Sequence, residues 1–555
     1  MTYDKYRPRV AYFCMEYGLD ESLPIYAGGL GVLAGDILKT AFDLKLPFIG
    51  IGILWKEGYT TQLINEHGWP YDRPATYTRD TLQDIGITIH ITIRGEQVPV
   101  RVWRVDSFGN APLYLLDTAV PGSSYDWVTR RLYGGTPQDR IAQEIVLGIG
   151  GIRALEALGH TVDVYHFNEG HAVLAGIELI RRKKAKGLTF DEALEATRRE
   201  VVFTTHTPVM AGNEEHEHSL LRYMGAYDGL SWEEMRRIGD EPFNMTVAGL
   251  RLAHLANGVS KLHGMTARAM WSDKDDRAPI VAITNGVHVD TWMHPNMRRA
   301  YESRLGLWAP HTQAKRELLQ AIAKRTGVQL NPQSLLIGFA RRAAMYKRPD
   351  LIFQRMDIIG PLLESGRVQM VFSGKTHPQD ESSKHLVSKI TEITQYFPQS
   401  VVFLENYDME LGRLLTAGCD VWLNNPQRPL EASGTSGIKA ALNGCLNLSV
   451  LDGWWIEGCQ HGVNGWQFGG GYEGHNQSQY DLASLYEMLL QEVLPTYYEN
   501  PSRWQNMMLA SINTAYHRFS SQRMLTEYYN ILYQPSRTVK LLAEEIEQVM
   551  IGTLH

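Results

Sequence analysis

The stretch Leu335-Leu336-Ile337-Gly338-Phe339-Ala340-Arg341-Arg342 decides the fold class of this chain. A short, nearly continuous apolar run that ends in a polar loop is typical of a strand buried on both faces of a sheet. Similar runs recur on both sides of it, and most are followed by a glycine or polar loop and then by a helical pattern. They span Val10–Phe13, Phe48–Leu54, Val162–Phe167, Val201–Thr204, Ile280–Ile283, Val368–Phe372, Val401–Leu404, Val421–Leu423 and Leu446–Val450. Strands that alternate with helices predict an α/β fold built on parallel sheets.

The series of strands pauses between Trp292 and Leu335, where Ala314–Thr326 has the pattern of a charged amphipathic helix. We therefore place a domain boundary near residue 310 and predict two doubly wound Rossmann-like domains that face a central cleft. The first is predicted over 1–310 and the second over 311–520. Helices are predicted over 521–555, with a break near Pro535, and are expected to pack back on the first domain.

One pair of segments departs from the parallel pattern. Ile85–Ile93 and Val98–Val105 alternate apolar and polar residues around a turn, which predicts an antiparallel hairpin. We expect this hairpin to decorate the first domain.

Composition excludes several classes of protein. The 555 residues are 44% hydrophobic and carry a net charge of −7, which argues against extensive disorder and against nucleic acid as the main partner. The four cysteines form no CxxC pair, so a disulfide framework is not expected. No signal peptide and no membrane-spanning run is visible, and we predict a cytoplasmic protein without membrane contact.

Ligands of doubly wound sheets bind beyond the carboxyl ends of the strands, so candidate binding residues are expected in the loops after the strands. Tyr26–Asp36 is a glycine-rich loop before a helix, and ligand binding and tight packing explain it about equally well. Glu169 with His171, and His206, each follow a strand in the first half. Asn285 has two interpretations, a ligand for sugar hydroxyls or the cap of a turn.

The loop Arg341–Arg348 places four cations directly after a strand. Arginine binds phosphate bidentately and lysine supplies a point charge, so an oxyanion site is the favoured interpretation over a solvated basic loop.

The segment from Glu431 to Gly444 carries the strongest signal. Its glycines and small residues predict backbone donors that cradle a phosphate. Lys439 then falls about one turn inside a helix, in an otherwise apolar run, where a buried ammonium would be costly. A lysine that forms a Schiff base with pyridoxal phosphate removes this cost and uses the phosphate cradle.

These residues together resemble the α-glucan (glycogen/maltodextrin) phosphorylase family. The likeness extends over nearly the whole chain, and Glu431-Ala432-Ser433-Gly434-Thr435 through Lys439 and Asn443 is similar to the pyridoxal-lysine signature of that family. The resemblance implies a glycosyltransferase-B architecture and a retaining phosphorolysis. The terminal glucosyl unit of an α-1,4-glucan moves to inorganic phosphate and gives glucose 1-phosphate.

The resemblance also implies a role for each matched residue. Arg342, Lys347, His206 and Lys439 are the implied catalytic residues. Gly29, Leu30, Glu169, His206, Asn285, Glu431, Ser433 and Gly434 are the implied substrate-binding residues. Lys439, Thr435, Ser436, Arg341 and Trp292 are the implied residues around pyridoxal 5'-phosphate, and no metal is implied.

The chain departs from the family pattern at three positions. Ile438 stands before the lysine where methionine is usual, Ala344 replaces a histidine of the basic loop, and Asp408 stands near the position of an arginine. The glycine loop begins at residue 28, so we expect a short form without the N-terminal regulatory extension and without activation by AMP. A homo-oligomer stays open at this point.

Other functions were weighed against this one. A nucleotide-sugar-dependent glucosyltransferase of the glycogen-synthase kind would share the architecture and the basic loop but would not need Lys439. A non-catalytic glucan-binding protein would share the fold alone. The string Glu214-Glu215-His216-Glu217-His218 contains zinc-ligand residue types, but no convincing third ligand is visible, and a solvated loop or helix start is the favoured interpretation.

Overall fold

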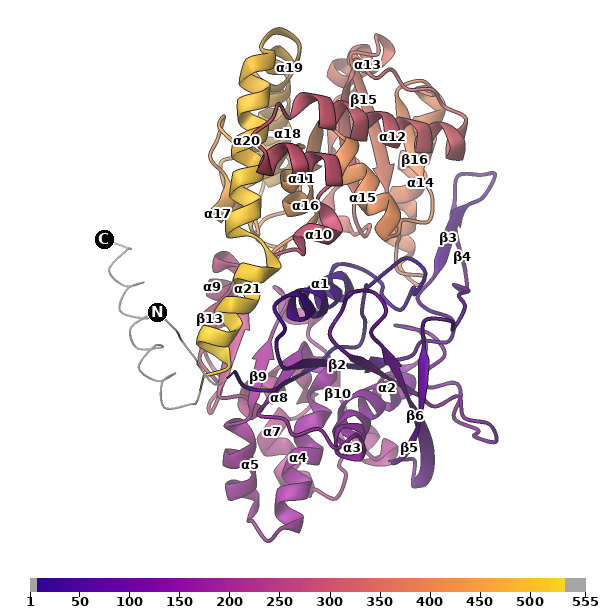
Figure 1. The fold of residues 1–555 in the computed structure, drawn as a ribbon, viewed down its shortest axis with the longest axis vertical. Helices are drawn as coiled ribbons and strands as arrows, with labels where there is room; N and C mark the ends of the chain where they lie inside the picture. The colour runs from indigo at the N-terminus through magenta and orange to yellow at the C-terminus, as the bar shows by residue number, and fades with distance from the viewer. Residues whose placement is uncertain (1–6, 535–555) are drawn as a thin grey trace, which may run out of the picture. The chain divides into compact units, whose positions relative to one another are not determined.

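A computed structural model describes residues 7–534 of the chain. Its contacts divide the chain into two compact units (Figure 1). Of the described residues, the first unit comprises 7–59, 75–284 and 524–534, and the second comprises 60–74 and 285–523. By contacts the longer segment of the second unit thus starts at Asn285, upstream of residue 310, and 60–74 also belong to this unit. The domain boundaries over 1–310, 311–520 and 521–555 stay a prediction.

The first unit is built on a nine-stranded sheet. Its strands, from one edge to the other, are β13 (Ile280–Ala282), β12 (Leu255–Gly258), β9 (Val201–Thr204), β8 (Val164–Asn168), β1 (Val10–Phe13), β2 (Phe48–Ile53), β7 (Leu113–Asp117), β6 (Glu96–Val105) and β5 (Gln83–Ile93). The seven strands from β13 to β7 pair in parallel, and β7, β6 and β5 pair antiparallel. The predicted hairpin is therefore present as β5 and β6. Strand β7 pairs with β6, so the hairpin forms the edge of the main sheet.

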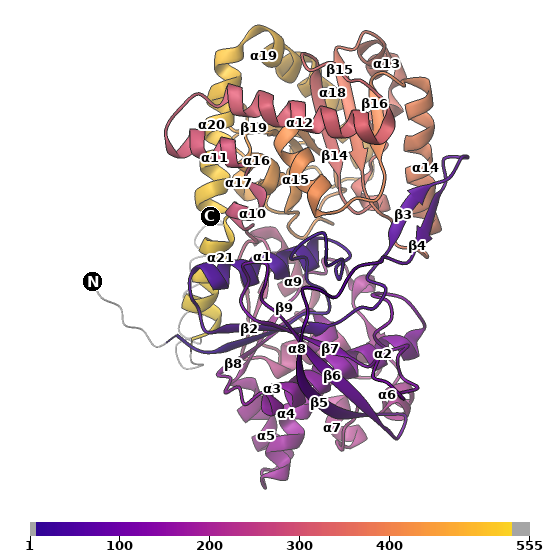
Figure 2. The same ribbon diagram turned by 45° about the vertical axis from the view of Figure 1, so that its right-hand side comes forward.

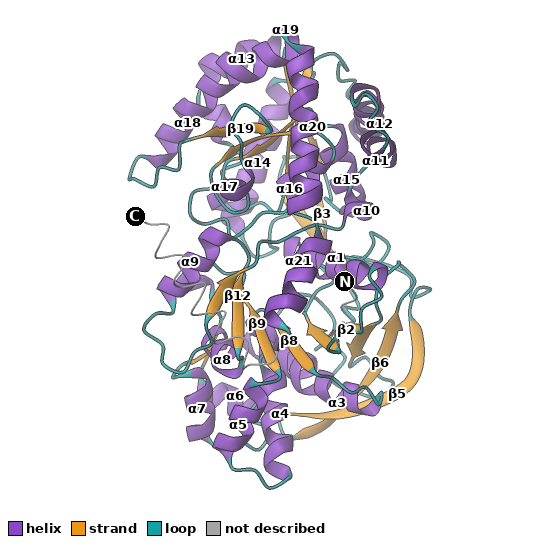
Figure 3. Cartoon of the chain, turned by 60° about the vertical axis from the view of Figure 1, so that its left-hand side comes forward, coloured by secondary structure: helices purple, strands orange, loops and turns teal. Residues whose placement is uncertain are grey.

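Helices accompany this sheet (Figure 3). They are α1 (Gly29–Asp43), α2 (Pro137–Ile145), α3 (Gly151–Ala157), α4 (Leu174–Ala185), α5 (Phe190–Arg198), α6 (His218–Met224), α7 (Trp232–Gly239), α8 (Met245–Leu252) and α9 (Lys261–Met270), and a two-stranded ribbon is made by β10 (Glu215–His216) and β11 (Phe243–Asn244). Local sequence fixes several helix starts: Thr189 with Glu192, and Ser231 with Glu234, form capping boxes before α5 and α7.

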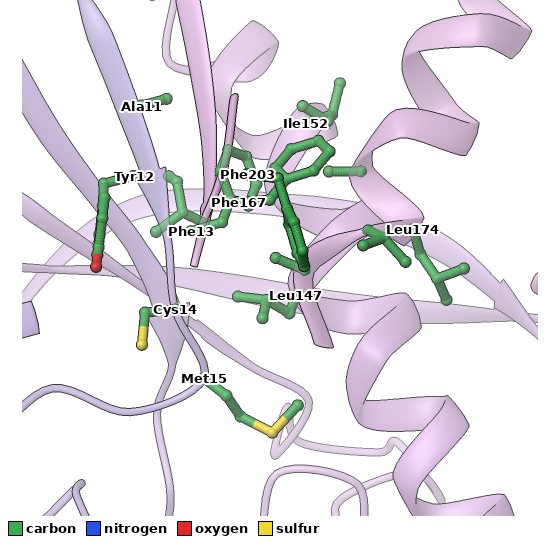
Figure 4. Close-up of a cluster of buried hydrophobic side chains, with 14 of the residues drawn as sticks. Ala11, Tyr12, Phe13, Cys14, Met15, Leu147, Ile152, Phe167, Leu174 and Phe203 are labelled. Atoms are coloured by element: carbon green, nitrogen blue, oxygen red, sulfur yellow. The ribbon is translucent and has the colours of Figure 1, made fainter. Parts of the chain in front are cut away.

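The core of the first unit lies between β1, β8, β9 and the helices α3 and α4 (Figure 4). Phe13 and Phe167 meet edge to face with ring centroids 5.9 Å apart. One π-helical turn (Val146–Gly150) joins α2 to α3, and a Cβ on Gly148 would lie 2.5 Å from the backbone nitrogen of Ala175. Gly148 thus permits close packing of this turn on α4, and Gly151 leaves room for the ring of Phe13, which a Cβ would approach to 2.6 Å.

The second unit is built on a six-stranded sheet that is parallel throughout. Its order is β16 (Val401–Leu404), β15 (Val368–Ser373), β14 (Leu335–Ala340), β17 (Val421–Asn424), β18 (Leu446–Val450) and β19 (Gly465–Phe468), and a separate hairpin is made by β3 (Thr61–Ile64) and β4 (Pro70–Arg73). The predicted strand Leu335–Phe339 is central in this sheet. The coarse prediction of an α/β fold with parallel sheets is confirmed, whereas β3, β4, β7, β10, β11, β12 and β19 were not predicted.

Helices also accompany the second sheet (Figure 2). They are α10 (Val289–Trp292), α11 (Pro295–Glu302), α12 (Trp308–Thr326), α13 (Met356–Glu364), α14 (Glu381–Tyr396), α15 (Met409–Gly418), α16 (Ser436–Leu442), α17 (Trp455–Gly458), α18 (Gln477–Met488), α19 (Leu494–Glu499) and α20 (Pro501–Arg518). The predicted amphipathic helix is α12, which ends at Gly327 in the left-handed conformation. A core of Leu318, Leu336, Val371, Leu415 and Trp422 holds α12 and α15 on the sheet.

Beyond α20 the chain continues into α21 (Ser521–Glu527) and a π-helical turn at Tyr528–Leu532. Within the first unit, His166 Nδ1 lies 2.8 Å from the hydroxyl of Tyr533, and His254 Nε2 lies 3.2 Å from the carbonyl oxygen of Leu532. The predicted break at Pro535 and the helices after it lie outside the described residues. Within 7–534 no helix combines the length and the apolar character that a membrane crossing needs.

Candidate functional site

The site residues that the sequence predicts fall into two sets, one in each unit. Gly29, Leu30, Glu169 and His206 belong to the first unit. Asn285, Trp292, Arg341, Arg342, Lys347, Glu431, Ser433, Gly434, Thr435, Ser436 and Lys439 belong to the second. The two sets are described separately.

The basic loop after β14 forms an ion cluster with Glu431. Arg341 Nη2 donates to Glu431 Oε2, and Lys347 Nζ lies 3.4 Å from the same oxygen. All three side chains are at most 12% exposed. Burial, outweighed by the charges of Arg341 and Lys347, leaves the pKa of Glu431 below its ordinary value. The carboxylate is therefore ionised at neutral pH.

Lys347 is the member of this cluster whose charged form is disfavoured by its surroundings. Burial lowers its pKa to about 7; Arg341 and Arg342 add to the effect, and Glu431 opposes it. Arg342 is exposed. A bound anion would favour the ammonium form of Lys347, so the cluster is suited to a phosphate.

The cluster also holds unused donors. Among the described residues, Nε and Nη1 of the buried Arg341 and Oγ of Ser433 have no hydrogen-bond partner. Gly434 adopts φ +73°, and a Cβ there would lie 3.4 Å from Cδ of Glu431 and 3.5 Å from Arg341 Nη2. The backbone of the Glu431–Thr435 loop thus passes close to the ion cluster, as its glycine permits.

The sequence interpretation assigned all four cations of the loop Arg341–Arg348 to one oxyanion site. In the structure Arg348 is not part of that site. Its guanidinium is buried, donates to the carbonyl oxygens of Asn425 and Pro426 at 2.8 Å, and pairs with Asp481 at 2.7 Å. Arg348 is a structural tie between the basic loop, the loop after β17 and α18, because its donors are used by the protein itself.

Lys439 lies on the buried side of α16, and its Nζ is 3.6 Å from the centroid of the Trp292 ring. Asn443 connects the two: its Nδ2 donates to the carbonyl oxygens of Trp292 (2.8 Å) and Lys439 (2.9 Å), and its Oδ1 accepts from the backbone of His294 at 2.7 Å. The asparagine four residues after the lysine is therefore the residue that fixes α10 against α16.

The loop before α16 is held by residues that follow β18. Asp452 Oδ2 accepts from the backbone of Glu431 at 2.9 Å, and the backbone nitrogen of Trp454 donates to the carbonyl oxygen of Ser433 at 2.9 Å. Burial raises the pKa of Asp452 to about 7. Ser436 Oγ accepts from Trp422 Nε1 at 3.3 Å, and the carbonyl oxygen of Thr435 accepts from the backbone of Lys439. Asp452 was not predicted as a site residue, although its place after a strand is a usable signal.

Asn285 lies directly at the start of the second unit, and the cap interpretation has no support among the described residues. Its Oδ1 is buried without a hydrogen-bond partner there. Gly286 next to it has no room for a side chain, because the carbonyl oxygen of Ser520 occupies that place.

In the first unit, Glu169 and His206 form a half-buried polar pair. Glu169 Oε1 accepts from the backbone of His206 and, at 3.2 Å, from Thr207 Oγ1. His206 Nε2 lies 2.8 Å from Asn168 Oδ1. Burial lowers the pKa of His206 to about 3 and raises that of Glu169. The imidazole is neutral, and its Nδ1 is the acceptor when Nε2 donates to Asn168.

The glycine loop at the start of α1 serves two purposes. A Cβ on Gly31 would lie 2.6 Å from Glu16 Oε2, and Gly35 packs against the backbone of Gly18. A Cβ on Gly28 or Gly29, by contrast, would meet no described atom within 4 Å. Packing therefore explains Gly31 and Gly35 and leaves Gly28 and Gly29 available for a ligand.

Glu16 organises this loop and was missed from the sequence. Its Oε2 accepts from the backbone nitrogens of Ala27 (2.6 Å) and Gly28 (3.2 Å), and its Oε1 accepts from the hydroxyl of Tyr133 at 2.7 Å. Glu16 stands three residues after the end of β1, in the loop beyond the carboxyl end of that strand, where ligands of such sheets bind.

The string at 214–218 is in part the helix start that the sequence predicts, because α6 begins at His218 and Glu215 and Glu217 are exposed, but His216 and His218 are buried rather than solvated. His216 is buried and lies 2.9 Å from Glu144, and Arg140 pairs with Glu214 at 2.8 Å. Within the described chain, ligand atoms of Glu144, Glu214 and His216 come within 4.8 Å of one another. The guanidinium of Arg140 lies 3.2 Å from Glu144 as well, so the two carboxylates already have a cation between them.

The three residues that depart from the expected pattern have different surroundings, and only Asp408 has a local role among them. Ile438 is fully buried. Asp408 caps α15 by accepting from the backbone of Leu411 at 2.9 Å. Ala344 precedes a single 3₁₀ turn at Met345–Lys347.

Comparison with known proteins shows which family the chain is similar to. The model of the carbohydrate phosphorylase family matches residues 303–473, which include the basic loop and Lys439. The maltodextrin phosphorylase of Thermococcus litoralis is 40% identical and aligns over 98% of this chain and 72% of its own length. The glycogen phosphorylase of Mycobacterium tuberculosis is 38% identical and aligns over 95% of this chain and 71% of its own length. The glycogen phosphorylase of Aquifex aeolicus is 36% identical and aligns over 98% of this chain and 88% of its own length. The chain belongs to the carbohydrate phosphorylase family.

Proposed function

We propose that this chain is an α-glucan phosphorylase. It transfers the terminal glucosyl unit of an α-1,4-glucan, glycogen or maltodextrin, to inorganic phosphate and releases glucose 1-phosphate with retained configuration. The observation that carries the proposal is the buried Arg341–Glu431–Lys347 cluster, in the same unit as the Lys439–Trp292 pair. The names of the similar enzymes support the choice of substrate.

The residues fit pyridoxal 5'-phosphate as the cofactor. Lys439 supplies a buried amine beside an aromatic ring, and the unpaired donors of Arg341 suit a phosphate group. Lys439 would hold the cofactor covalently, with Trp292, Thr435, Ser436 and Arg341 around it. When bound, the cofactor would supply a phosphate that exchanges protons with the substrate phosphate.

The remaining residues bind and orient the substrates. Arg342 and Lys347 would clamp the substrate phosphate and stabilise its charge in the transition state. Asn285, Glu431, Ser433 and Gly434 would bind the glucosyl unit. In the first unit, His206, Glu169, Gly29 and Leu30 would add contacts to it. A neutral His206 offers a hydrogen bond without adding a charge that would repel a developing oxocarbenium ion.

The finer architecture belongs to this proposal. We expect the glycosyltransferase-B arrangement of two doubly wound domains, with the ranges 1–310, 311–520 and 521–555. All four cysteines are free, which supports a reducing, cytoplasmic setting.

Two measurements test the function. Phosphate-dependent release of glucose 1-phosphate from maltodextrin is expected for the purified protein. Absence of the product with every glucan tried would contradict the proposal, and turnover that needs a nucleotide sugar would favour the glycogen-synthase alternative.

The cofactor is tested with Lys439→Ala. The protein is expected to show pyridoxal absorbance, and the variant is expected to lose it together with about 10³-fold or more of the activity, because the attachment site is gone. Lys347→Arg keeps a cation and leaves Lys439 in place, so it should keep the absorbance. A colourless active wild-type protein would refute pyridoxal phosphate.

A further inference from the structure

A polar pocket lies in the second unit, between the loop after β17 and the start of α18. It has a volume of about 560 Å³, a size typical of small-ligand sites. Its lining consists of Gln427, Arg428 and Pro429 from one segment and of residues 473–479 from the other. Neither segment has a part in the proposed reaction.

The lining is dense in uncharged hydrogen-bonding groups. Gln427, Asn476, Gln477 and Gln479 contribute amides that can both donate and accept, and Ser478 adds a hydroxyl. Gln477 is only 5% exposed, yet its Nε2 has no hydrogen-bond partner in the described part of the chain. A buried amide without a partner is costly, so this one indicates a ligand that completes it.

The charges of the pocket cancel. Arg428 Nε donates to Glu473 Oε1 at 2.7 Å, and its Nη1 donates to the carbonyl oxygen of Leu451 at 3.1 Å. The guanidinium is thus already paired, and Glu473 would repel an anion. A neutral ligand with many hydroxyl groups suits this lining better than a phosphate does.

Two tyrosines border the lining segment in the sequence. Tyr472 precedes it and Tyr480 follows it, their ring centroids are 5.0 Å apart, and their side chains are 43% and 52% exposed. An exposed pair of rings offers an apolar surface for the C–H face of a sugar.

The pocket is tied to the candidate active site through the backbone. Gln427 donates from its backbone nitrogen to the carbonyl oxygen of Tyr346, the neighbour of Lys347, at 2.6 Å. Pro429 stands two residues before Glu431. Arg348 Nη1 donates to Ser478 Oγ at 3.1 Å. A glucan held in the pocket would therefore lie within the unit that carries the basic loop.

We propose that this pocket is a second carbohydrate site, which holds glucosyl units of a long α-glucan away from the bond that is cleaved. The inference rests on the proposed function for the identity of the sugar. Its consequence is that long glucans bind more tightly than short ones, because only a long chain, or a second chain end, occupies both places.

The test uses the full-length protein and maltoheptaose as the probe. Hydrogen exchange of the segment 471–480 is expected to slow when maltoheptaose binds. The double variant Asn476→Ala/Gln479→Ala removes two exposed amides and should lose this protection. Gln399→Ala is the matched control, because it removes an exposed amide before β16, at the opposite edge of the same sheet.

Kinetics give the second readout. In the double variant the KM for a long maltodextrin is expected to rise about tenfold, the effect of two lost hydrogen bonds, while kcat and the KM for maltotetraose stay unchanged. No protection of 471–480 in the wild type, or equal protection in wild type and double variant, overturns the pocket. Protection without any phosphorolysis supports the pocket and refutes the proposed function instead.

Discussion

Lys347 has a side chain whose charge is set by its surroundings within the ion cluster of Arg341, Glu431 and Lys347. Its pKa is lowered to about 7 by burial and by the neighbouring arginines, so it is partly neutral at physiological pH. The charged form is favoured below that pH and is lost above it. Anion affinity of the cluster is therefore expected to decrease as the pH rises through about 7.

Sulfate provides a clean measurement, because its charge does not change in this range. We expect thermal stabilisation by sulfate to be larger at pH 6 than at pH 8.5 in the wild type. In Lys347→Arg the dependence on pH should become clearly weaker, since arginine stays protonated, while Asp452 still titrates near pH 7. The same pH dependence in both proteins would mean that another group titrates.

Glu431 sets the midpoint of this titration. Its carboxylate raises the pKa of Lys347 and partly offsets the effect of burial. Glu431→Gln removes that charge. The pH at which thermal stabilisation by sulfate has fallen by half is therefore expected to move below 7. Asp452→Asn, which alters the backbone partner of Glu431 but not its charge, is the comparison. An upward shift of the midpoint in Glu431→Gln would contradict the assignment.

At the scale of elements, Arg348 connects the basic loop with α18. The guanidinium and Asp481 are 9% and 1% exposed, and burial raises the pKa of Asp481 even beside its partner. Arg348→Met leaves this carboxyl without a cation, and we expect a loss of about 3–5 kcal/mol in the free energy of unfolding.

Denaturant unfolding measures this loss. The double variant Arg348→Met/Asp481→Leu should recover much of the stability, because no buried charge remains. A single variant as stable as the wild type would show that the tie contributes little.

At the scale of the whole molecule, each of the two large hydrophobic cores described above contains residues of one unit only. In the second unit, Asp420 accepts from Lys315 Nζ at 2.6 Å and lies 2.9 Å from His311 Nε2. Lys315 and Asp420 are almost fully buried. The network joins α12 to the strand region of β14 and β17, because the backbone of Leu336 donates to Asp420 as well.

Lys315→Met breaks this network and is expected to cost about 3–5 kcal/mol. Hydrogen exchange should accelerate in β14 and β17 and stay unchanged in β1 and β8. Equal acceleration in both units would contradict a local role.

The pKa of Asp420 is lowered, since Lys315 and His311 outweigh burial. Its contribution to stability is therefore present at neutral pH and is lost in acid as the carboxylate takes up a proton.

Much of the site could be predicted from the sequence, because its signals are local. The apolar run before Arg341 predicts the strand, and the glycines and Lys439 within a few residues predict a cradle and an amine on one helix. The strands that escaped prediction are short: β12 and β19 have four residues each and β7 has five, and each includes polar or glycine positions.

Sequence alone determined the fold class, the order of most strands along the chain and the residues that could carry chemistry, because hydrophobic periodicity and loop composition are properties of neighbouring residues. Only the tertiary structure decided which charges face each other. It separated Arg348, a buried tie, from Arg341 and Lys347, which share Glu431 although more than eighty residues lie between. It also gave Asn443 its role and revealed Glu16. The physical reason is that a buried ion or amide is defined by its partners, and those partners come from distant segments of the chain.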